Sequence, residues 1–217
     1  MTISWKKEAV LLAIIALMFV AAAWQWPVAP VRIPAHWGAD GQVNGWGGKF
    51  TGLMLLPLIT LAVWALLLFL PRIDPRRENY ERFWSAFFVV RLALVIYLAA
   101  IHGAILFAMH GHPGAVGRSI PVLAGTLFIT VGLVLGKFRP NWFAGVRTPW
   151  TLSSDLSWNK TNRLAGWLFV ATGLATIAAG LAASSLAIDV LVGGLTLSGA
   201  VSVAYSYFVW KGDPNRK

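Results

Sequence analysis

The chain has 217 residues, of which 58% are hydrophobic and only 12% are charged, and its mean hydropathy is +0.68. A soluble domain of this length needs more polar surface, so the composition excludes that class and places the chain among membrane proteins. The formal net charge of +10 would suit a nucleic-acid binder. The basic residues lie in short loops between apolar runs, however, as they do in membrane proteins, and we expect no direct contact with nucleic acid. Cysteine is absent, which excludes disulfides, thiolate metal sites and cysteine nucleophiles.

Six apolar segments are long enough to cross a membrane, because a helix needs about 20 mostly apolar residues to span a hydrocarbon core of ~30 Å. The first could instead be a signal peptide, since Lys6 and Lys7 precede it. Its length and its Trp24/Trp26 pair favour a retained helix. The sequence therefore predicts an all-α integral membrane protein with six transmembrane helices. The segments lie at about 8–26, 52–70, 84–109, 119–136, 164–183 and 187–210.

Lysine and arginine are unevenly divided between the two sides of these segments. With a cytoplasmic N-terminus, fourteen lie on the cytoplasmic side and three outside, while Arg91 lies within the third segment. This bias over short loops follows the positive-inside rule and predicts that both termini are cytoplasmic. The outer three are Arg32, Lys49 and Arg118, and the cytoplasmic group comprises Lys6, Lys7, Arg72, Arg76, Arg77, Arg82, Lys137, Arg139, Arg147, Lys160, Arg163, Lys211, Arg216 and Lys217.

Two connections are too long to be simple turns: an outer loop at about 27–51 and an inner loop at about 137–163. Both are rich in Gly, Pro and Trp, which favours compact structures at the membrane surface. Ser154 followed by Asp155 has the pattern of an N-cap with an acidic first turn, so we expect the fifth helix to begin near Ser154. The chain then divides into a two-helix module with the outer loop at 1–70, a third helix with its flanking loops at 71–118, and a three-helix module at 119–217.

Glycines recur in the last three segments at spacings that suit helix packing. Small residues let helix backbones approach closely in lipid, where hydrophobicity cannot drive association. The pattern predicts a packed bundle and carries no information about function. The residues are Gly166, Gly173 and Gly180 at seven-residue intervals, the pair Gly132 and Gly136, and Gly193, Gly194 and Gly199 in the last segment.

The outer loop contains His36, Trp37, Asp40, Trp46 and Lys49. His36 and Asp40 could bind a metal or exchange protons, but neither has a partner at a recognised ligand spacing. Turn-forming glycines and interfacial tryptophans explain the stretch as a structured loop that could contact a ligand.

Three histidines, His102, His110 and His112, gather near the outer end of the third segment. No carboxylate lies nearby in the sequence, so a polar loop is favoured over a zinc site. We expect no metal and no cofactor.

Arg91 is the one basic residue well inside an apolar segment. Charges within the membrane are functional candidates. Arg91 lies only seven residues beyond Trp84, about 10 Å of helix, so its guanidinium could also extend to the cytoplasmic headgroups. Asp189, at the opposite depth, is a poor partner, and both interpretations stay open.

The inner loop contains the run from Phe138 to Ser153. One interpretation is a basic, aromatic hairpin that touches anionic lipids. The other is a folded docking surface in which Arg147 is held by neighbouring carbonyls or a carboxylate and Trp150 is an aromatic anchor. No pair of base and nucleophile is present, so we expect no catalytic residues and no enzyme activity.

Two stretches resemble a known family. The inner loop and the helix after it resemble the SdpI family of membrane immunity proteins, which act against the sporulation-delaying peptide toxin of bacilli. The outer stretch from Pro34 to Lys49 resembles the N-terminal module of unassigned function that often accompanies this family. One departure is Asn162, where many members have His before the Arg, so a role for a titrating imidazole there is not expected. The similar inner residues are Arg139, Pro140, Asn141, Gly145, Arg147, Thr148, Pro149, Trp150, Thr151, Leu152, Ser153, Trp158, Thr161, Arg163 and Gly166.

The resemblance implies a multipass protein of a bacterial plasma (inner) membrane that confers resistance to a membrane-active peptide toxin. In the founding system such a protein also captures a cytoplasmic repressor at the membrane. A small transporter or lipid-handling protein that uses Arg91 is the alternative, and the oligomeric state is left open. We expect the outer loop to sense the peptide through His36, Trp37, Trp46 and Lys49. We expect the inner loop to bind a partner through Arg139, Asn141, Arg147, Thr148, Pro149, Trp150 and Arg163.

Overall fold

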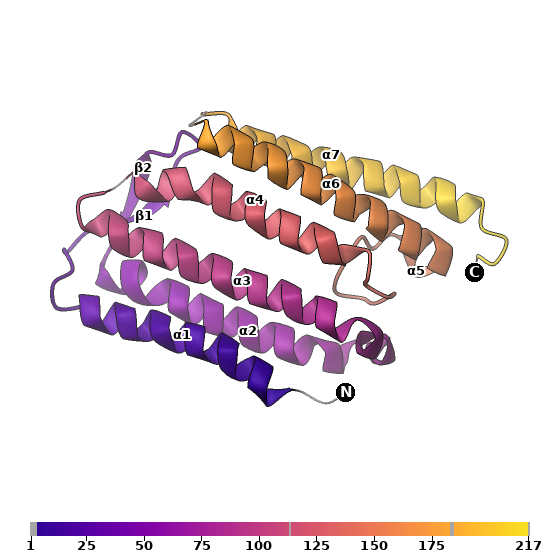
Figure 1. Ribbon diagram of the computed structural model, residues 1–217, viewed down its shortest axis with the longest axis horizontal. Helices are drawn as coiled ribbons and strands as arrows, with labels where there is room; N and C mark the ends of the chain where they lie inside the picture. Colours follow the sequence, from indigo (N-terminus) through magenta and orange to yellow (C-terminus); the bar gives the residue numbers. More distant parts are fainter. Residues whose placement is uncertain (1–3, 113, 183–184, 217) are drawn as a thin grey trace.

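The computed structural model describes residues 4–112, 114–182 and 185–216. Lys217 and the side chain of Arg118, which enter the charge count above, lie outside this part. The long helices run side by side along one axis (Figure 1). The helices are α1 (Trp5–Gln25), α2 (Leu55–Ile73), α3 (Tyr80–Met109), α4 (Ala115–Leu135), α5 (Pro149–Leu152), α6 (Asp155–Leu181) and α7 (Ala187–Lys211), with a π-helical turn at Phe50–Met54 and a 3-10 turn at Arg77–Asn79.

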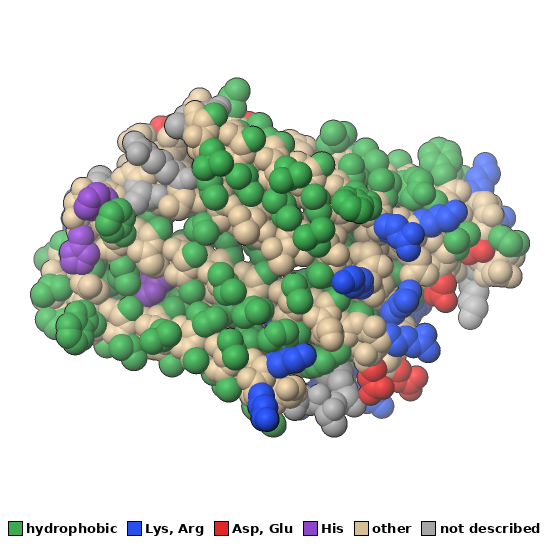
Figure 2. Space-filling view, in the orientation of Figure 1, with side chains coloured by type: hydrophobic (Ala, Val, Ile, Leu, Met, Phe, Trp, Pro, Cys, Tyr) green, Lys and Arg blue, Asp and Glu red, His purple; other side chains and the backbone are tan. Residues whose placement is uncertain are grey.

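Five of the described helices are long and apolar enough to cross a membrane: α1, α2 with its preceding turn, α3 with its preceding turn, α6 and α7. The remaining predicted segment corresponds to α4, whose apolar part Ser119–Leu135 is shorter. Both chain termini and α5 lie at one end of the bundle, which we call the basic end because lysine and arginine side chains gather there (Figures 1 and 2). The prediction of a helical membrane protein is confirmed.

The sequence did not predict the antiparallel hairpin in the outer loop. Strands β1 (Ile33–Trp37) and β2 (Val43–Gly47) pair antiparallel, with register shifts around His36. An entirely helical description of the chain is therefore wrong for this segment. The strands are only five residues long, β1 contains a proline and β2 contains two glycines, so the usual sequence signal for a strand is weak.

Helices α4 and α6 approach each other closely because glycines lie at their contact. A Cβ placed on Gly166 would lie 2.5 Å from the carbonyl oxygen of Gly132, and one on Gly173 would lie 2.5 Å from that of Gly125. No real side chain tolerates such distances, so the two backbones touch only because these positions are glycine. The predicted packing role of Gly166 and Gly173 is confirmed.

Helix α7 packs on α6 mainly through hydroxyl groups and less through glycine contacts. Gly194 accommodates Thr172 of α6, but nothing described lies within 4 Å of a Cβ on Gly193 or Gly199, so the packing role predicted for these two is wrong within the chain. Instead the Ser157 hydroxyl donates to the Ser206 carbonyl oxygen at 2.8 Å. Buried hydroxyls thus connect α6 to α7, as small polar residues do between helices in lipid.

We expect Gly166→Ala to lower the free energy of unfolding by about 2 kcal/mol, because the added methyl group forces α4 and α6 apart. Gly199→Ala is the matched control, because its site is open and alanine is the better helix former. Titration with a denaturing detergent in mixed micelles, followed by circular dichroism, measures both variants. Equal stability of the two would show that the α4–α6 contact does not limit the fold.

Candidate functional site

Asn141 organises the inner loop from within. It is fully buried, and its Oδ1 accepts backbone N–H bonds from Phe143 at 2.9 Å and Ala144 at 2.7 Å. Its Nδ2 donates to the carbonyl oxygens of Arg139 and Ala144, both at 2.9 Å. One amide side chain therefore replaces the hydrogen bonds that a helix or sheet would supply here.

Asp74 ties the α2–α3 connection to the same loop. Its buried carboxylate accepts from the Trp142 N–H at 2.9 Å, from the Tyr80 hydroxyl at 3.0 Å and from the Arg76 N–H at 2.7 Å. A buried carboxylate needs several donors to offset its lost hydration. These three bonds therefore fix the loop against the start of α3.

Asn162 holds the second half of the inner loop. Its Oδ1 accepts from the Val146 N–H at 2.8 Å, and its Nδ2 donates to the Trp158 carbonyl oxygen at 3.0 Å. The neighbouring Gly145 has φ +108°, and a Cβ there would lie 2.6 Å from Asn162 Oδ1. The Trp158 indole N–H donates to the Phe138 carbonyl oxygen at 2.9 Å. The asparagine thus does its structural work as a neutral amide, which accepts and donates at once.

The Thr-Pro-Trp-Thr stretch forms the short helix α5. Thr148 caps it: its hydroxyl accepts from the Thr151 N–H, and the Thr151 hydroxyl accepts in return from the Thr148 N–H. Pro149 occupies the first helical position, where its missing N–H costs nothing. Thr148 Oγ1 also lies 3.0 Å from Ser206 Oγ, so α5 rests on α7.

The predicted partner-binding residues of the inner loop differ in exposure. Asn141 and Thr148 are buried supports, whereas Arg139 and Arg147 are exposed. Arg147 donates to the Trp142 carbonyl oxygen at 2.6 Å, and Arg139 donates to Asn159 Oδ1 at 3.1 Å. The loop thus presents two cations from a backbone that is held in place.

Trp150 and Arg163, two further predicted partner-binding residues, lie at the margins of the inner loop. The Trp150 ring packs edge-on against Tyr207 of α7, with ring centres 5.2 Å apart. Arg163 stands apart on the α4 side of α6, beside Gly136.

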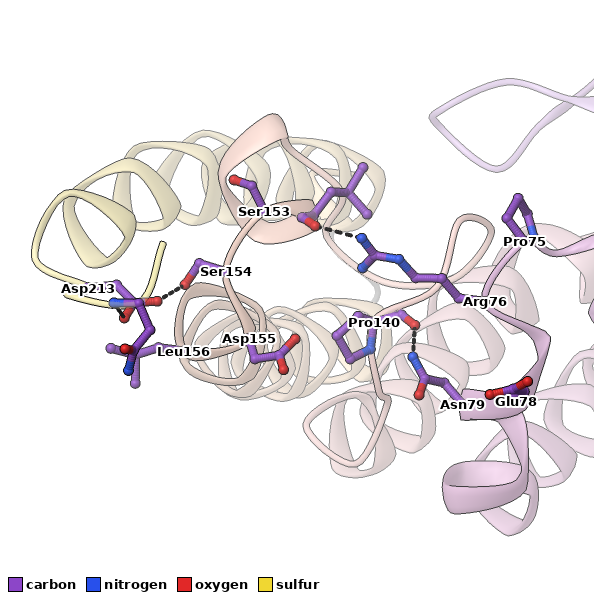
Figure 3. A pocket seen from close by; sticks show the side chains of 12 residues that line it. Pro75, Arg76, Glu78, Asn79, Pro140, Ser153, Ser154, Asp155, Leu156 and Asp213 are labelled. Atoms are coloured by element: carbon purple, nitrogen blue, oxygen red, sulfur yellow. Dashed lines mark hydrogen bonds between the residues drawn. The ribbon is translucent and has the colours of Figure 1, made fainter. Parts of the chain in front are cut away.

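A cleft of about 690 Å³ opens at the basic end (Figure 3). Three segments line it: the α2–α3 connection, the inner loop and the C-terminal turn. Arg76 donates to the Leu152 carbonyl oxygen and Asn79 to the Pro140 carbonyl oxygen, each at 2.7 Å. The main lining residues are Pro75, Arg76, Glu78, Asn79, Pro140, Leu152, Ser153, Ser154, Asp155, Leu156, Asp213 and Asn215.

Ser154 joins the cleft to the C-terminal turn. It is the N-cap of α6, with the Ser157 N–H donating to its hydroxyl oxygen at 2.9 Å, so the predicted helix start is confirmed. The same hydroxyl donates to Asp213. This bond, with that from the Asn215 N–H, holds the pKa of the Asp213 carboxyl below its usual value. Asp74, Asn79 and Asp213 escaped sequence reasoning, although Asp-Pro pairs next to apolar segments mark the turns at 74 and 213.

Arg91 has an acidic partner within the bundle. Its guanidinium binds the Glu8 carboxylate through two nitrogens, at 3.0 Å and 2.5 Å, and both residues are about 1% exposed. The Trp64 indole N–H donates to the same carboxylate at 2.9 Å. The interpretation that Arg91 extends to the headgroups is therefore wrong, because a buried bidentate pair satisfies the charge where it stands.

The predicted outer residues lie on and around the hairpin. His36 donates from Nδ1 to Asn44 across the strands, and Lys49 donates to the Trp26 carbonyl oxygen at 2.9 Å. Trp46 is half exposed, and Trp37 lines a second cleft of about 470 Å³ between the hairpin turn and the nearby ends of α4 and α7. The arrangement brings Trp37 to a concave surface and leaves His36 and Trp46 on the hairpin itself.

The three histidines do not converge. His102 is buried and donates to the Leu53 carbonyl oxygen at 3.0 Å, His110 bonds Gln25 at 3.1 Å, and His112 stacks on Phe107. Within the described part of the chain, no three His, Cys, Asp or Glu side chains lie close enough to hold a metal ion.

We expect Asn141→Asp to open the inner loop, because the new carboxylate oxygen would face the carbonyl oxygens of Arg139 and Ala144. The loss of two buried donors costs about 2–3 kcal/mol. Asn159→Asp is the matched control, because that position acts only as an acceptor for Arg139. Trypsin should cleave at Arg147 at least about tenfold faster in the Asn141 variant. Equal cleavage rates would show that Asn141 does not hold the loop.

Two segments of the chain match known protein families. Residues 137–209, which include the inner loop, α6 and most of α7, match the SdpI/YfhL protein family. Residues 13–61, which include the hairpin, match a domain of unknown function, DUF1648. The chain is 21% identical over 206 residues to the immunity protein SdpI of Bacillus subtilis (strain 168), covering 95% of this chain and 97% of that protein.

No solved structure matches the chain significantly. The family resemblance carried by the Arg-Thr-Pro-Trp-Thr-Leu loop and the outer histidine–tryptophan stretch is confirmed by these matches. The chain is thus similar to SdpI-family membrane proteins, with an SdpI/YfhL match at 137–209 and a DUF1648 match at 13–61.

Proposed function

We propose that the protein is a non-catalytic immunity protein of a bacterial plasma membrane, which protects its cell against a membrane-active peptide. The observation that carries the proposal is the match to an immunity protein over 95% of the chain. That match extends across both the hairpin segment and the inner-loop segment, so the two chains resemble each other at both ends of the bundle. A fragment shared by unrelated proteins would cover only one of these two segments.

The proposal includes six spans with both termini in the cytoplasm. Both termini lie at the basic end, which an even number of spans requires (Figure 1). Lysine and arginine gather at that end (Figure 2), and the positive-inside rule places such an end in the cytoplasm. Helix α4 then serves as the additional span, completed by the residues that flank its apolar part.

In this orientation the hairpin meets a peptide that arrives from outside, and the inner loop faces the cytoplasm. Arg139 and Arg147 are exposed there, Trp142 is half exposed, and the 690 Å³ cleft lies beside them. Cations and an exposed aromatic ring around a cleft are features of protein-binding surfaces. The partner that we propose is a cytoplasmic repressor protein recruited when the peptide is present.

The alternative of a transporter that uses Arg91 has less support. Arg91 is paired with Glu8, and neither residue lines the clefts described above. The geometry favours a structural role for this ion pair in holding α1 against α3.

Topology is tested with single cysteines, since the chain has none of its own. Cysteines at Ala39 and Ser185 should react with an impermeant maleimide in intact cells, whereas cysteines at Asn79, Ala144 and Asn215 should react only after permeabilisation. The first two lie in the β1–β2 turn and the α6–α7 connection, and the other three lie in the α2–α3 connection, in the α4–α5 connection and after α7, at the opposite end of the bundle (Figure 1). Labelling of Ala144→Cys in intact cells would reverse the orientation and remove the inner loop from the cytoplasm.

Protection and partner recruitment should be separable by mutation. A deletion strain should become several-fold more sensitive to cationic amphipathic peptides, and the intact gene should restore resistance. Trp37→Ala and Trp46→Ala should lose protection, because these rings lie at the end that the peptide meets. Arg147→Lys and Trp150→Ala should retain most protection but fail to bring the repressor to the membrane fraction, since an ammonium does not replace the directional bonds of a guanidinium.

Val31→Ala and Arg77→Ala are the matched controls for the two ends, because both side chains are exposed and lie outside the named surfaces. Expression and membrane insertion are checked for every variant. If the deletion strain is as resistant as the parent to all peptides, the immunity proposal fails. If both groups of variants lose the same activity to the same degree, one pathway through the bundle explains the protein better than two surfaces.

A further inference from the structure

A third hollow, of about 340 Å³, lies between α4 and α6 near the basic end. It is a groove on the helix surface, lined by Gly132, Leu133, Gly136, Lys137, Arg163 and Trp167. It belongs neither to the inner-loop cleft nor to the hairpin.

Glycine creates the groove. A Cβ on Gly132 would lie 2.5 Å from the Gly166 carbonyl oxygen and 2.9 Å from the Val170 side chain, and one on Gly136 would lie 3.3 Å from Arg163 Cα, so glycine backbone and Val170 form the floor. Leu133 and Trp167, 59% and 64% exposed, line the groove at this crossing. A close helix crossing with small residues at its floor leaves an apolar groove on the surface of the bundle.

Two cations stand at the polar mouth of the groove. Lys137 follows Gly136, the C-cap of α4, and Arg163 lies on α6 about one turn before Trp167, about 6 Å nearer the basic end. Both side chains are exposed, and neither forms a hydrogen bond or an ion pair with another side chain among the described residues. Tryptophan marks the level of the headgroup boundary in membrane proteins, so the two cations stand at phosphate depth.

We propose that this groove binds one anionic phospholipid. The headgroup phosphate lies between Lys137 and Arg163, where a guanidinium and an ammonium supply charge-assisted donors. One acyl chain lies over Gly132 beside Leu133 and Trp167. Charge complementarity selects the occupant, because two unpaired cations over an apolar channel fit an anionic amphiphile and disfavour a zwitterionic one.

The site also connects lipid to the inner loop. Arg163 directly follows Asn162, whose amide holds the Val146 N–H at 2.8 Å. A bound headgroup therefore restrains the turn of α6 that supports the loop. This inference does not depend on the immunity role.

The test uses the full-length protein in lipid nanodiscs with a bimane label on Leu133→Cys. Brominated phosphatidylglycerol and brominated phosphatidylcholine are compared as quenchers at equal mole fractions. We expect phosphatidylglycerol to reach half-maximal quenching at about a tenfold lower mole fraction. Lys137→Ala/Arg163→Ala should abolish that preference, whereas Lys137→Arg/Arg163→Lys should keep it because both cations remain.

Arg72→Ala/Arg77→Ala is the matched control, because Arg72 in the last turn of α2 and Arg77 in the turn before α3 carry the same charge and do not line the groove. It should retain the preference. Equal quenching by the two lipids in the labelled parent would overturn the proposal. So would an equal loss of preference in the control and groove variants, because that would show attraction to the whole basic surface. Circular dichroism of each variant separates a lost site from a lost fold, and the Lys–Arg exchange tests the site even if the double alanine variant does not fold.

Discussion

The fold depends on the backbone contact between α4 and α6. Lipid is as apolar as leucine, so helices in a membrane gain little from hydrophobicity and associate through packing and hydrogen bonds. Gly132 against Gly166 and Gly125 against Gly173 bring two carbonyl-lined surfaces together over about two turns of helix. Helix α7 then joins α6 through hydroxyl groups, as in the bond from Ser157 to Ser206. Helices α4, α6 and α7 are therefore held together by small and polar residues.

The inner loop shows what an irregular segment at a membrane surface requires. Its backbone has no ladder of its own, so Asn141, Asn162 and Asp74 supply acceptors and donors from side chains. The supporting groups are buried, and Arg139 and Arg147 remain exposed. One of these supports is the carboxamide of Asn162. A carboxamide has one fixed acceptor and one fixed donor group at every physiological pH, so this loop is supported without a titrating group.

Sequence reasoning reached the features whose signals are local. Hydropathy identified the long helices, and Ser154 with Asp155 marked the start of α6. Three glycines at seven-residue intervals marked the face of α6 that packs on α4. The partner of Arg91 was missed because Glu8 lies 83 residues away, and a pairing across helices leaves no local pattern. The hairpin was missed because a proline in β1 and two glycines in β2 weaken the sequence pattern of a strand. Helix α5 could have been predicted, because Thr148 is a capping residue and is followed by a proline, which is favoured at the first position of a helix.

The two halves of the bundle are fastened at both ends. At the basic end, Arg76 and Asn79 from the first half bind the carbonyl oxygens of Leu152 and Pro140.

At the other end, Gly41 of the hairpin turn lies against Gly117 of α4, where a Cβ on Gly117 would lie 2.6 Å from Gly41 Cα. Between these points the space-filling surface shows openings between α3 and α4 (Figure 2), and the buried apolar residues divide into separate clusters, two of which lie toward the ends. A displacement of the hairpin would therefore act on α4 directly, and α4 shares its backbone contact with α6, which carries Trp158 and Asn162. The α4–α6 pair thus joins the hairpin end of the bundle to the inner loop through continuous backbone contacts.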